Sequence, residues 1–284
     1  MKRYLLFFVC LFGLLGTQSA KASAQDPFVL MTVPKSGSHM IIKALHFLTG
    51  ASPVWHTHFP SRYYISPKDG FLYTHLCISD MLEDNYAALP NLKKIINIRD
   101  LRDVCVSMVH HICTNLWPGM SAEMRNEFKK WSFNDQLLFV IQYDYDIHEV
   151  AAFAPNSLQI SIGKIADQVK KFSEDPSCLV CRYEDLVGPG GGGTKEAQLK
   201  ELIRISKYLK LNVEESTLAE IGDYLYGDEI NPFGKGDLVH FQSTFNNGKM
   251  GKWREVFTEE HKKAFKERLG EALIALGYEK DENW

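Results

Sequence analysis

The sequence predicts an α/β protein with a mostly parallel central sheet flanked by helices. From residue 26 onward, short apolar runs typical of strands alternate with segments whose apolar residues recur at helical spacing. This alternation is characteristic of parallel sheets that carry helices on both faces. The chain has 284 residues, of which 45% are hydrophobic and 24% charged. That composition supplies enough apolar material for a substantial core in one globular domain.

The first half of the chain is expected to contribute three strands and two helices. Residues 28–33 are apolar and β-prone, and residues 38–48 carry apolar residues at helical spacing, which predicts a strand followed by a helix. Residues 71–75 are a short strand candidate and residues 94–98 a stronger one. A second helix is expected to follow over residues 102–113.

The second half repeats the alternation. Residues 132–152 and 162–172 are expected to be helical, residues 178–182 to form a buried strand, and residues 195–209 to form another helix. Residues 188–193 contain only glycine and proline. They are expected to be a flexible loop within the domain and not a phosphate-binding loop, because no strand leads directly into them.

The first 24 residues are expected to be a secretory signal peptide. Lys2 and Arg3 precede an apolar run over residues 4–16, and the small residues that follow allow cleavage after Ala24. The alternative is a short membrane anchor, although a run of 13 residues is short for a span that needs about 20. The sequence therefore predicts a single domain over residues 25–284 in an exported protein, with membrane association only if the segment is not cleaved.

Charge and cysteine content exclude several classes of protein. A formal net charge of -3 argues against binding of nucleic acid by bulk electrostatics. Five cysteines follow the N-terminal segment, and an odd number does not suggest a disulfide framework. Cys178 and Cys181 lie in an apolar run and are expected to be structural thiols. No metal site is expected, since His56 and His58 lack further ligands at recognisable spacing.

A lysine and several small residues stand where the first strand passes into the first helix. The segment from Val33 to His39 reads Val-Pro-Lys-Ser-Gly-Ser-His. The N-terminus of a helix presents backbone N–H groups to an anion, Gly37 leaves room for close approach, and Lys35 adds a positive charge. Because the glycine follows the lysine, the loop is not a Walker A motif. It nonetheless predicts a site for a phosphate.

A second anion site is expected after the strand over residues 94–98. Arg99 closes that strand, and Ser107 lies eight residues further along, in the following helix. An arginine can hold a phosphate through a bidentate fork. Ligands of open α/β sheets bind at the carboxyl ends of strands, so the two loops could face one ligand with two anionic groups. Arg102, which lies nearby, is expected to form a surface ion pair.

Five segments, taken in order, resemble the motif set of the cytosolic-type sulfotransferases, which use 3′-phosphoadenosine 5′-phosphosulfate (PAPS). They are Pro34-Lys35-Ser36-Gly37-Ser38, Thr74-His75-Leu76, residues 99–107 with His110-His111, Arg182-Tyr183-Glu184-Asp185-Leu186, and residues 248–253 with Phe257-Thr258. The resemblance spans residues 28–260. It implies a single α/β domain of the P-loop-related, nucleotide-kinase-like fold. It also implies an enzyme that moves a sulfuryl group from PAPS to a hydroxyl group without a metal or a covalent intermediate.

The resemblance assigns a donor site and a general base. Lys35 would stabilise charge on the leaving phosphate, Arg99 would bind the 3′-phosphate and Tyr183 would lie near the adenine. His75 would accept the proton of the acceptor hydroxyl, a role that suits an imidazole with an unperturbed pKa of about 6.5. Catalysis would thus rest on His75 and Lys35. The full donor site implied in this way comprises Lys35, Ser36, Gly37, Ser38, His39, Met40, Arg99, Ser107, Tyr183, Asn246, Asn247 and Gly248.

Three departures from the family pattern concern the donor. Met40 stands where the family often has an aromatic residue, and Tyr73 stands where a lysine often precedes the histidine. Asn246-Asn247 replaces the common Arg-Lys. Loss of these two charges should weaken the hold on the 3′-phosphate by about 1 to 3 kcal/mol unless Lys249 or Lys252 compensates.

The acceptor is expected to be a small molecule, glycan or lipid that carries a hydroxyl group, and a homodimer is left open. One interpretation of the aromatic, loop-like segment over residues 55–71, with Trp117, is an acceptor pocket for an aromatic, sterol-like or lipid-like alcohol. The other is a set of core aromatic residues under a long loop. Two alternative functions remain: a catalytically impaired nucleotide-binding protein, for which Asn246-Asn247 argues, and a kinase-like phosphoryl transferase, which the absence of a Walker A motif disfavours.

Overall fold

The structure is a computed structural model that describes residues 28–51, 53–55, 71–75, 93–114, 122–142, 162–227 and 247–284. Within these residues, five parallel strands form one sheet in the order β2-β3-β1-β4-β5. The strands are β1 (Phe28–Thr32), β2 (Pro53–Trp55), β3 (Phe71–His75), β4 (Lys93–Ile98) and β5 (Cys178–Arg182). Thr32 at the end of the central strand lies opposite His75 on one side and Asn97 on the other.

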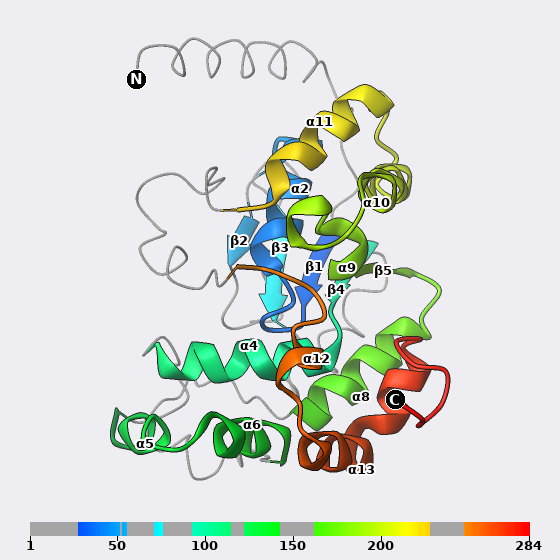
Figure 1. The fold of residues 1–284 in the computed structure, drawn as a ribbon. Helices are drawn as coiled ribbons and strands as arrows, with labels where there is room; N and C mark the ends of the chain where they lie inside the picture. Colours follow the sequence, from blue (N-terminus) through cyan, green and yellow to red (C-terminus); the bar gives the residue numbers. More distant parts are fainter. Residues whose placement is uncertain are drawn as a thin grey trace, which may run out of the picture.

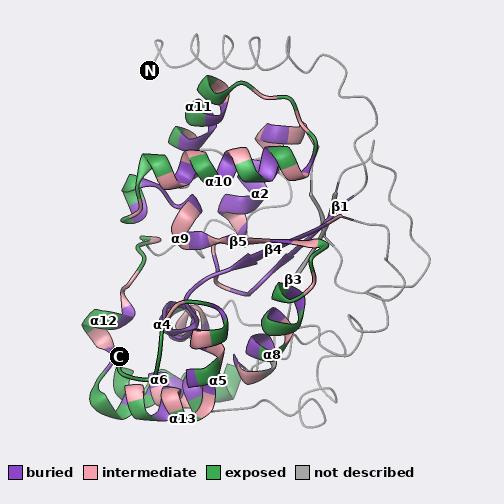
Figure 2. Ribbon diagram, turned by 90° about the vertical axis from the view of Figure 1, so that its right-hand side faces the viewer, coloured by how far each residue is buried: buried purple, intermediate pink, exposed green. Residues whose placement is uncertain are grey.

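Helices cover both faces of this sheet (Figures 1 and 2). One face carries α2 (Ser38–Thr49), α9 (Tyr183–Leu186), α10 (Lys195–Tyr208) and α11 (Glu215–Leu225). The other face carries α4 (Leu101–Cys113), α5 (Ala122–Phe128), α6 (Phe133–Gln142), α8 (Ile162–Ser173), α12 (Trp253–Val256) and α13 (Glu259–Ala275). The expected α/β class with a parallel sheet between helices is therefore confirmed.

Alternation along β1 explains why the sheet needs both layers. Val29 and Met31 point into the core beneath α4, α8 and α13, whereas Phe28 and Leu30 point into the core beneath α2 and α10. All four side chains are buried, as expected for a central strand covered on both faces.

Helix ends follow local rules of capping. α2 lies between Gly37 and Gly50, both of which have positive φ angles. The Asp100 side chain caps α4 by accepting the N–H of Arg102 at 3.0 Å. At α13, the side chains of Thr258 and His261 form a reciprocal capping box.

The expected elements are present, and their described ends differ from the expected ones by at most one residue. The helix expected over residues 132–152 is observed as α6, and its second half lies outside the described residues. No sequence pattern predicts β2, which is three residues long and begins with proline. The helices α5, α9, α11, α12 and α13 are likewise not among the expected elements.

Two local predictions are wrong. Residues 188–193 form a compact turn around the 3₁₀ helix η1 (Pro189–Gly191) instead of a flexible loop. Gly193 donates its N–H to the Gly188 carbonyl at 2.8 Å, and a Cβ at Gly190 would lie 2.6 Å from the Tyr226 ring. β5 is not wholly buried, because its residues alternate between buried and half-buried.

The described cysteines, Cys105, Cys113, Cys178 and Cys181, form no disulfide with one another. Burial raises the pKa of each thiol, that of Cys178 to about 12. Such thiols are largely protonated at neutral pH and therefore unreactive, in agreement with the expected structural role of Cys178 and Cys181. Among the described helices, none has the length and apolarity that crossing a membrane requires.

Candidate functional site

Two loops that carry cations meet at the carboxyl ends of β1 and β4. After β1 the chain enters α2 on one face of the sheet, and after β4 it enters α4 on the other (Figure 2). Ligands of open parallel sheets bind at such switch points. Lys35 lies in the first loop and Arg99 in the second, and the Arg99 Nη1 donates to the Lys35 carbonyl at 3.4 Å.

The loop after β1 has a fixed and unusual backbone conformation. Lys35 and Gly37 have φ angles of 65° and 82°, and a lysine in this region is uncommon. The Asn97 side chain on β4 donates to the carbonyl of Ser36 at 2.8 Å and to its hydroxyl at 2.9 Å. The Ser38 hydroxyl donates to the Thr32 hydroxyl at 2.8 Å. Strand residues therefore hold the loop in place at the start of α2.

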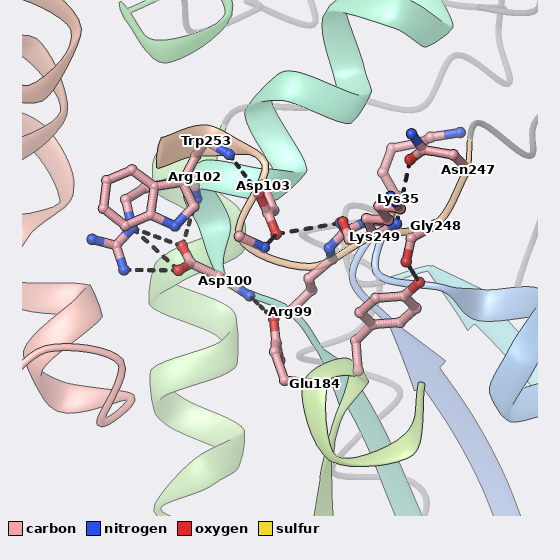
Figure 3. A network of polar contacts seen from close by, with 12 residues as sticks. Lys35, Arg99, Asp100, Arg102, Asp103, Glu184, Asn247, Gly248, Lys249 and Trp253 are labelled. Atoms are coloured by element: carbon pink, nitrogen blue, oxygen red, sulfur yellow. Dashed lines mark hydrogen bonds and ion pairs between the residues drawn. The ribbon is translucent and has the colours of Figure 1, made fainter. Parts of the chain in front are cut away.

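Arg99 joins the segments around the site (Figure 3). It is 7% exposed, and its Nη2 donates to the Lys249 carbonyl at 2.8 Å and to Asp103 Oδ2 at 3.3 Å. Its Cζ lies 4.5 Å from the centroid of the Tyr183 ring, within range of a cation–π interaction. The Arg99 Nε is buried and has no hydrogen-bond partner among the described residues. The guanidinium thus organises the site and retains one unused donor.

The Tyr183 ring packs against the loop after β1. Its hydroxyl donates to the Gly248 carbonyl, and a Cβ at Gly37 would lie 2.3 Å from its Cδ2. Only glycine at this position allows the tyrosine ring to approach so closely. Tyr183 therefore connects the β1 loop to the segment that contains Gly248.

That segment, residues 247–253, will be called the closing loop. Asp103 on α4 accepts the N–H of Gly251 at 2.6 Å and the N–H of Trp253 at 2.9 Å. Because Asp103 also contacts Arg99, one buried carboxylate fixes the closing loop and the arginine together.

Positively charged groups in the site act on one another. Burial, and after it the nearby charge of Arg99, lowers the pKa of Lys35 from 10.5 to about 8. The pKa of His110 on α4 is also lowered, by burial first and then by the charges of Lys35 and Lys252. Cations held this close repel one another, and an anionic ligand would relieve that repulsion.

The sulfotransferase domain family matches residues 25–277 of the chain. The chain belongs to this family. The sulfotransferase is also similar to solved structures. One is mouse sulfotransferase SULT7A1 complexed with PAP, at 19% identity and a TM-score of 0.58, with 92% of this chain and 89% of that chain covered. Another is retinol dehydratase in a complex with retinol and PAP, at 15% identity and a TM-score of 0.50, with 91% and 85% covered. No curated protein sequence matches the chain. The family and fold expected from the motifs are therefore confirmed.

The sulfotransferase brings part of the expected donor set into one cluster. Contacts link Lys35, Gly37, Arg99, Tyr183 and Gly248, as described above. These residues come from four separate stretches of sequence, so the fold assembles what the motif order only suggests.

For the other expected residues, the described contacts show no side-chain link to this cluster. Ser107 is half-buried on α4, and no hydrogen bond within the described residues links it to Arg99. Met40 is buried in the core beneath α2. Asn247 is exposed and directs its Oδ1 to the N–H of Lys249 at 3.4 Å, whereas Asn246 lies outside the described residues.

His75 ends β3 and lies opposite Thr32 in the sheet register. Its backbone is therefore at the carboxyl end of the strand next to β1, on the edge where the Lys35 loop begins. The His75 side chain is outside the described part of the structure, and its role stays a prediction.

The expectation for Arg102 is wrong. It is 1% exposed and pairs with Asp100 at 2.7 Å and with Glu279 at 2.5 Å. Its guanidinium also lies 3.7 Å from the ring centroid of Trp253. A buried arginine is tolerated because carboxylates and an aromatic face replace its hydration.

Sequence reasoning also missed Asp103 and Glu184. Glu184 Oε1 accepts the N–H of Asp100 at 2.9 Å, and burial raises the pKa of Glu184. For Asp103, the sequence signal is the repeat of Asp and Arg at residues 99–103, which does not show which charge is buried. Glu184 lies in the quoted segment of residues 182–186, which likewise does not show that its carboxylate is buried. Among the described residues, no group of His, Cys, Asp and Glu is arranged to hold a metal ion.

Proposed function

We propose that this sulfotransferase transfers a sulfuryl group from PAPS to the hydroxyl group of a small-molecule, glycan or lipid acceptor. The observation that carries the proposal is that the Lys35 loop after β1 and the Arg99 loop after β4 are in contact, and that the charge of Arg99 acts on Lys35. A ligand with two anionic groups suits two such charges better than a single phosphate would. The two neighbours of known structure are each complexed with PAP, which supports a donor of this chemistry.

The proposed donor site divides the nucleotide between two ends. The first turn of α2 and the Lys35 ammonium hold the 5′-phosphosulfate, because helix N-termini attract anions. Arg99 and Ser107 hold the 3′-phosphate, and Tyr183 contacts the adenine. The closing loop covers the 3′-phosphate side, with Lys249 and Lys252 in place of the charges that Asn246-Asn247 lacks. Support for Lys252 comes from His110, on which the charges of Lys252 and Lys35 both act.

The proposed reaction is an in-line displacement at sulfur. The acceptor oxygen forms a bond to sulfur while the bond from sulfur to the bridging phosphate oxygen breaks. The acceptor proton passes to His75, and Lys35 stabilises the negative charge that appears on the departing phosphate. No covalent enzyme intermediate and no metal are required.

One observation favours the alternative of nucleotide binding without turnover. The Asn247 side chain bonds to its own loop and brings no charge to the donor. The kinase-like alternative loses support, since the family is that of sulfotransferases.

Export remains part of the proposal and rests on the sequence pattern of residues 1–24, which lie outside the described residues. An exported sulfotransferase needs PAPS to be delivered to its compartment.

Thermal unfolding of the full chain with nucleotides tests the proposed function. PAP at 100 times its Kd should stabilise the fold by about 2.7 kcal/mol, and AMP, which lacks the 3′-phosphate, should stabilise it less. Stabilisation by ATP with Mg²⁺ but not by PAP would contradict the proposal.

Gly37→Ala should lower both stability and PAP affinity. The new methyl group adds a strained positive φ angle and a collision with the Tyr183 ring, which together should cost about 2 kcal/mol or more. Gly50→Ala is the matched control, because Gly50 also has a positive φ angle but nothing lies within 4 Å of its added Cβ. Urea unfolding and PAP titration of both variants measure the difference. Equal losses of stability in the two variants would show that the Tyr183 contact is unimportant.

A further inference from the structure

The last residues of the chain contact Arg102 and Glu184, which adjoin the proposed donor site. Residues 278–284, called the C-terminal tail here, follow α13 and lie beyond residue 277, where the family match ends. Figure 1 shows this end of the chain, in red, beside α8 and α13. The tail therefore has no role assigned by the family.

The tail encloses Arg102. Trp253 and Trp284 approach its guanidinium at 3.7 Å and 4.4 Å from their ring centroids. Glu279 Oε1 accepts from Arg102 Nη1 at 2.5 Å, and Asp100 pairs with the opposite edge of the guanidinium. Two of these four partners, Glu279 and Trp284, belong to the tail, so its removal would leave a buried cation partly unpaired.

A second contact connects the tail to the ends of β4 and β5. The Tyr278 hydroxyl donates to Glu184 Oε2 at 3.0 Å, and Glu184 Oε1 accepts the N–H of Asp100 at 2.9 Å. Asp100 directly follows Arg99, and Glu184 directly follows Tyr183. The tail thus supports the backbone beside two residues of the proposed donor site.

A third contact reaches the closing loop. The rings of Trp284 and Trp253 lie 5.5 Å apart in an edge-on arrangement. The backbone N–H of Trp253 donates to the carboxylate of Asp103, which also contacts Arg99. Displacement of Trp253 would therefore affect the carboxylate that positions the arginine.

We propose that the C-terminal tail is a positioning element of the donor site, which acts through Arg102, Glu184 and Trp253 to hold Arg99 and the closing loop in their binding geometry. Among the described residues, the tail makes no contact with a side chain that is proposed to bind the ligand. This inference rests on the proposed function for its ligand, PAP. Its effect is on binding of the donor and not on the acceptor.

Titration of full-length variants with PAP tests the proposal. Trp284→Ala should raise the Kd for PAP and the KM for PAPS about tenfold and leave the KM for the acceptor unchanged. Trp284→Phe, which keeps an aromatic face over Arg102, should recover most of the affinity. Lys280→Ala, at an exposed tail position, should behave as wild type. Leu218→Ala, in the core on the opposite face, controls for loss of stability and should keep the wild-type Kd.

Amide exchange provides a readout that is independent of the ligand. In Trp284→Ala, the N–H groups of Gly251 and Trp253 should exchange faster than in wild type, while those of β1 should not change. If Trp284→Ala does not fold, Tyr278→Phe takes its place, because it removes only the hydrogen bond to Glu184. Its Kd for PAP and its amide exchange rates are then compared with those of the wild type. A folded tail variant with wild-type PAP affinity and wild-type exchange overturns the proposal. If the wild-type protein binds no PAP, the proposed function fails, and the exchange rates alone decide whether the tail positions the closing loop.

Discussion

Replacement of His75 by alanine is expected to lower kcat by about 10²- to 10⁴-fold, which is the usual contribution of a general base. The affinity for PAP should not change, because the histidine faces the acceptor and not the nucleotide phosphates in the proposed reaction. The backbone of His75 ends β3 opposite Thr32, on the sheet edge where the Lys35 loop begins. Transfer rates measured with saturating PAPS and acceptor give kcat directly.

A second histidine provides the control. His46 lies on α2, where its Nδ1 is 2.9 Å from the Ala51 carbonyl, and His46→Ala should affect stability with little change in kcat. If His75→Ala turns over at the wild-type rate, His75 is not the base. A pH profile then locates the true base, since loss of the base removes the acidic limb of kcat.

Replacement of Lys35 by methionine is expected to lower kcat/KM for PAPS by about 10²- to 10³-fold, the loss typical when one donor to a developing negative charge is removed. Methionine fills similar volume and leaves the local backbone unchanged. The matched control is Lys43→Met. Lys43 is buried and its ammonium donates to the Gly227 carbonyl, so its loss should reduce stability and not transfer. An unchanged kcat/KM in Lys35→Met would remove this residue from the donor site.

The pH dependence of Lys35 provides an independent check with a defined sign. Its pKa in the folded protein is lowered to about 8, so the ammonium loses its proton as the pH rises through 8. Donor binding should therefore weaken in that range. The free energy of unfolding of the unliganded protein should instead rise with pH between pH 8 and the unfolded pKa of 10.5. The reason is that the unfolded chain binds more protons than the folded chain in this range.

Both pH effects should disappear in Lys35→Met. Measurement of PAP affinity and of urea unfolding from pH 7 to 10 separates them. If the affinity of the wild-type protein is constant across pH 8, the Lys35 charge does not bind the donor.

Local sequence patterns predicted the parts of the fold that depend on local chemistry. The strand over residues 28–33 and the helix after Gly37 follow from apolar spacing and from a glycine at a helix start. The same reasoning placed Lys35 and Arg99 at two strand ends, and the parallel sheet then required those ends to lie on one edge. β2 escaped prediction because three residues that begin with proline carry no strand pattern.

The supporting part of the site depends on contacts between distant residues and could not be predicted. Arg102 has the same charge and nearly the same sequence setting as Arg99. Its burial involves residues distant in sequence, because the ring centroids of Trp253 and Trp284 lie 3.7 Å and 4.4 Å from its guanidinium. Asp103 similarly acquires its role from the amides of Gly251 and Trp253, about 150 residues away.

The central claim is tested most directly by transfer of a labelled sulfuryl group from PAPS to a panel of phenols, sterols, sugars and other alcohols. The wild-type protein should label at least one hydroxyl acceptor without added metal, and His75→Ala should bind PAP normally but transfer at a rate lower by at least about 100-fold. Failure of the wild-type protein to label any acceptor, together with tight binding of PAP, would contradict the claim of catalysis and indicate a nucleotide-binding protein.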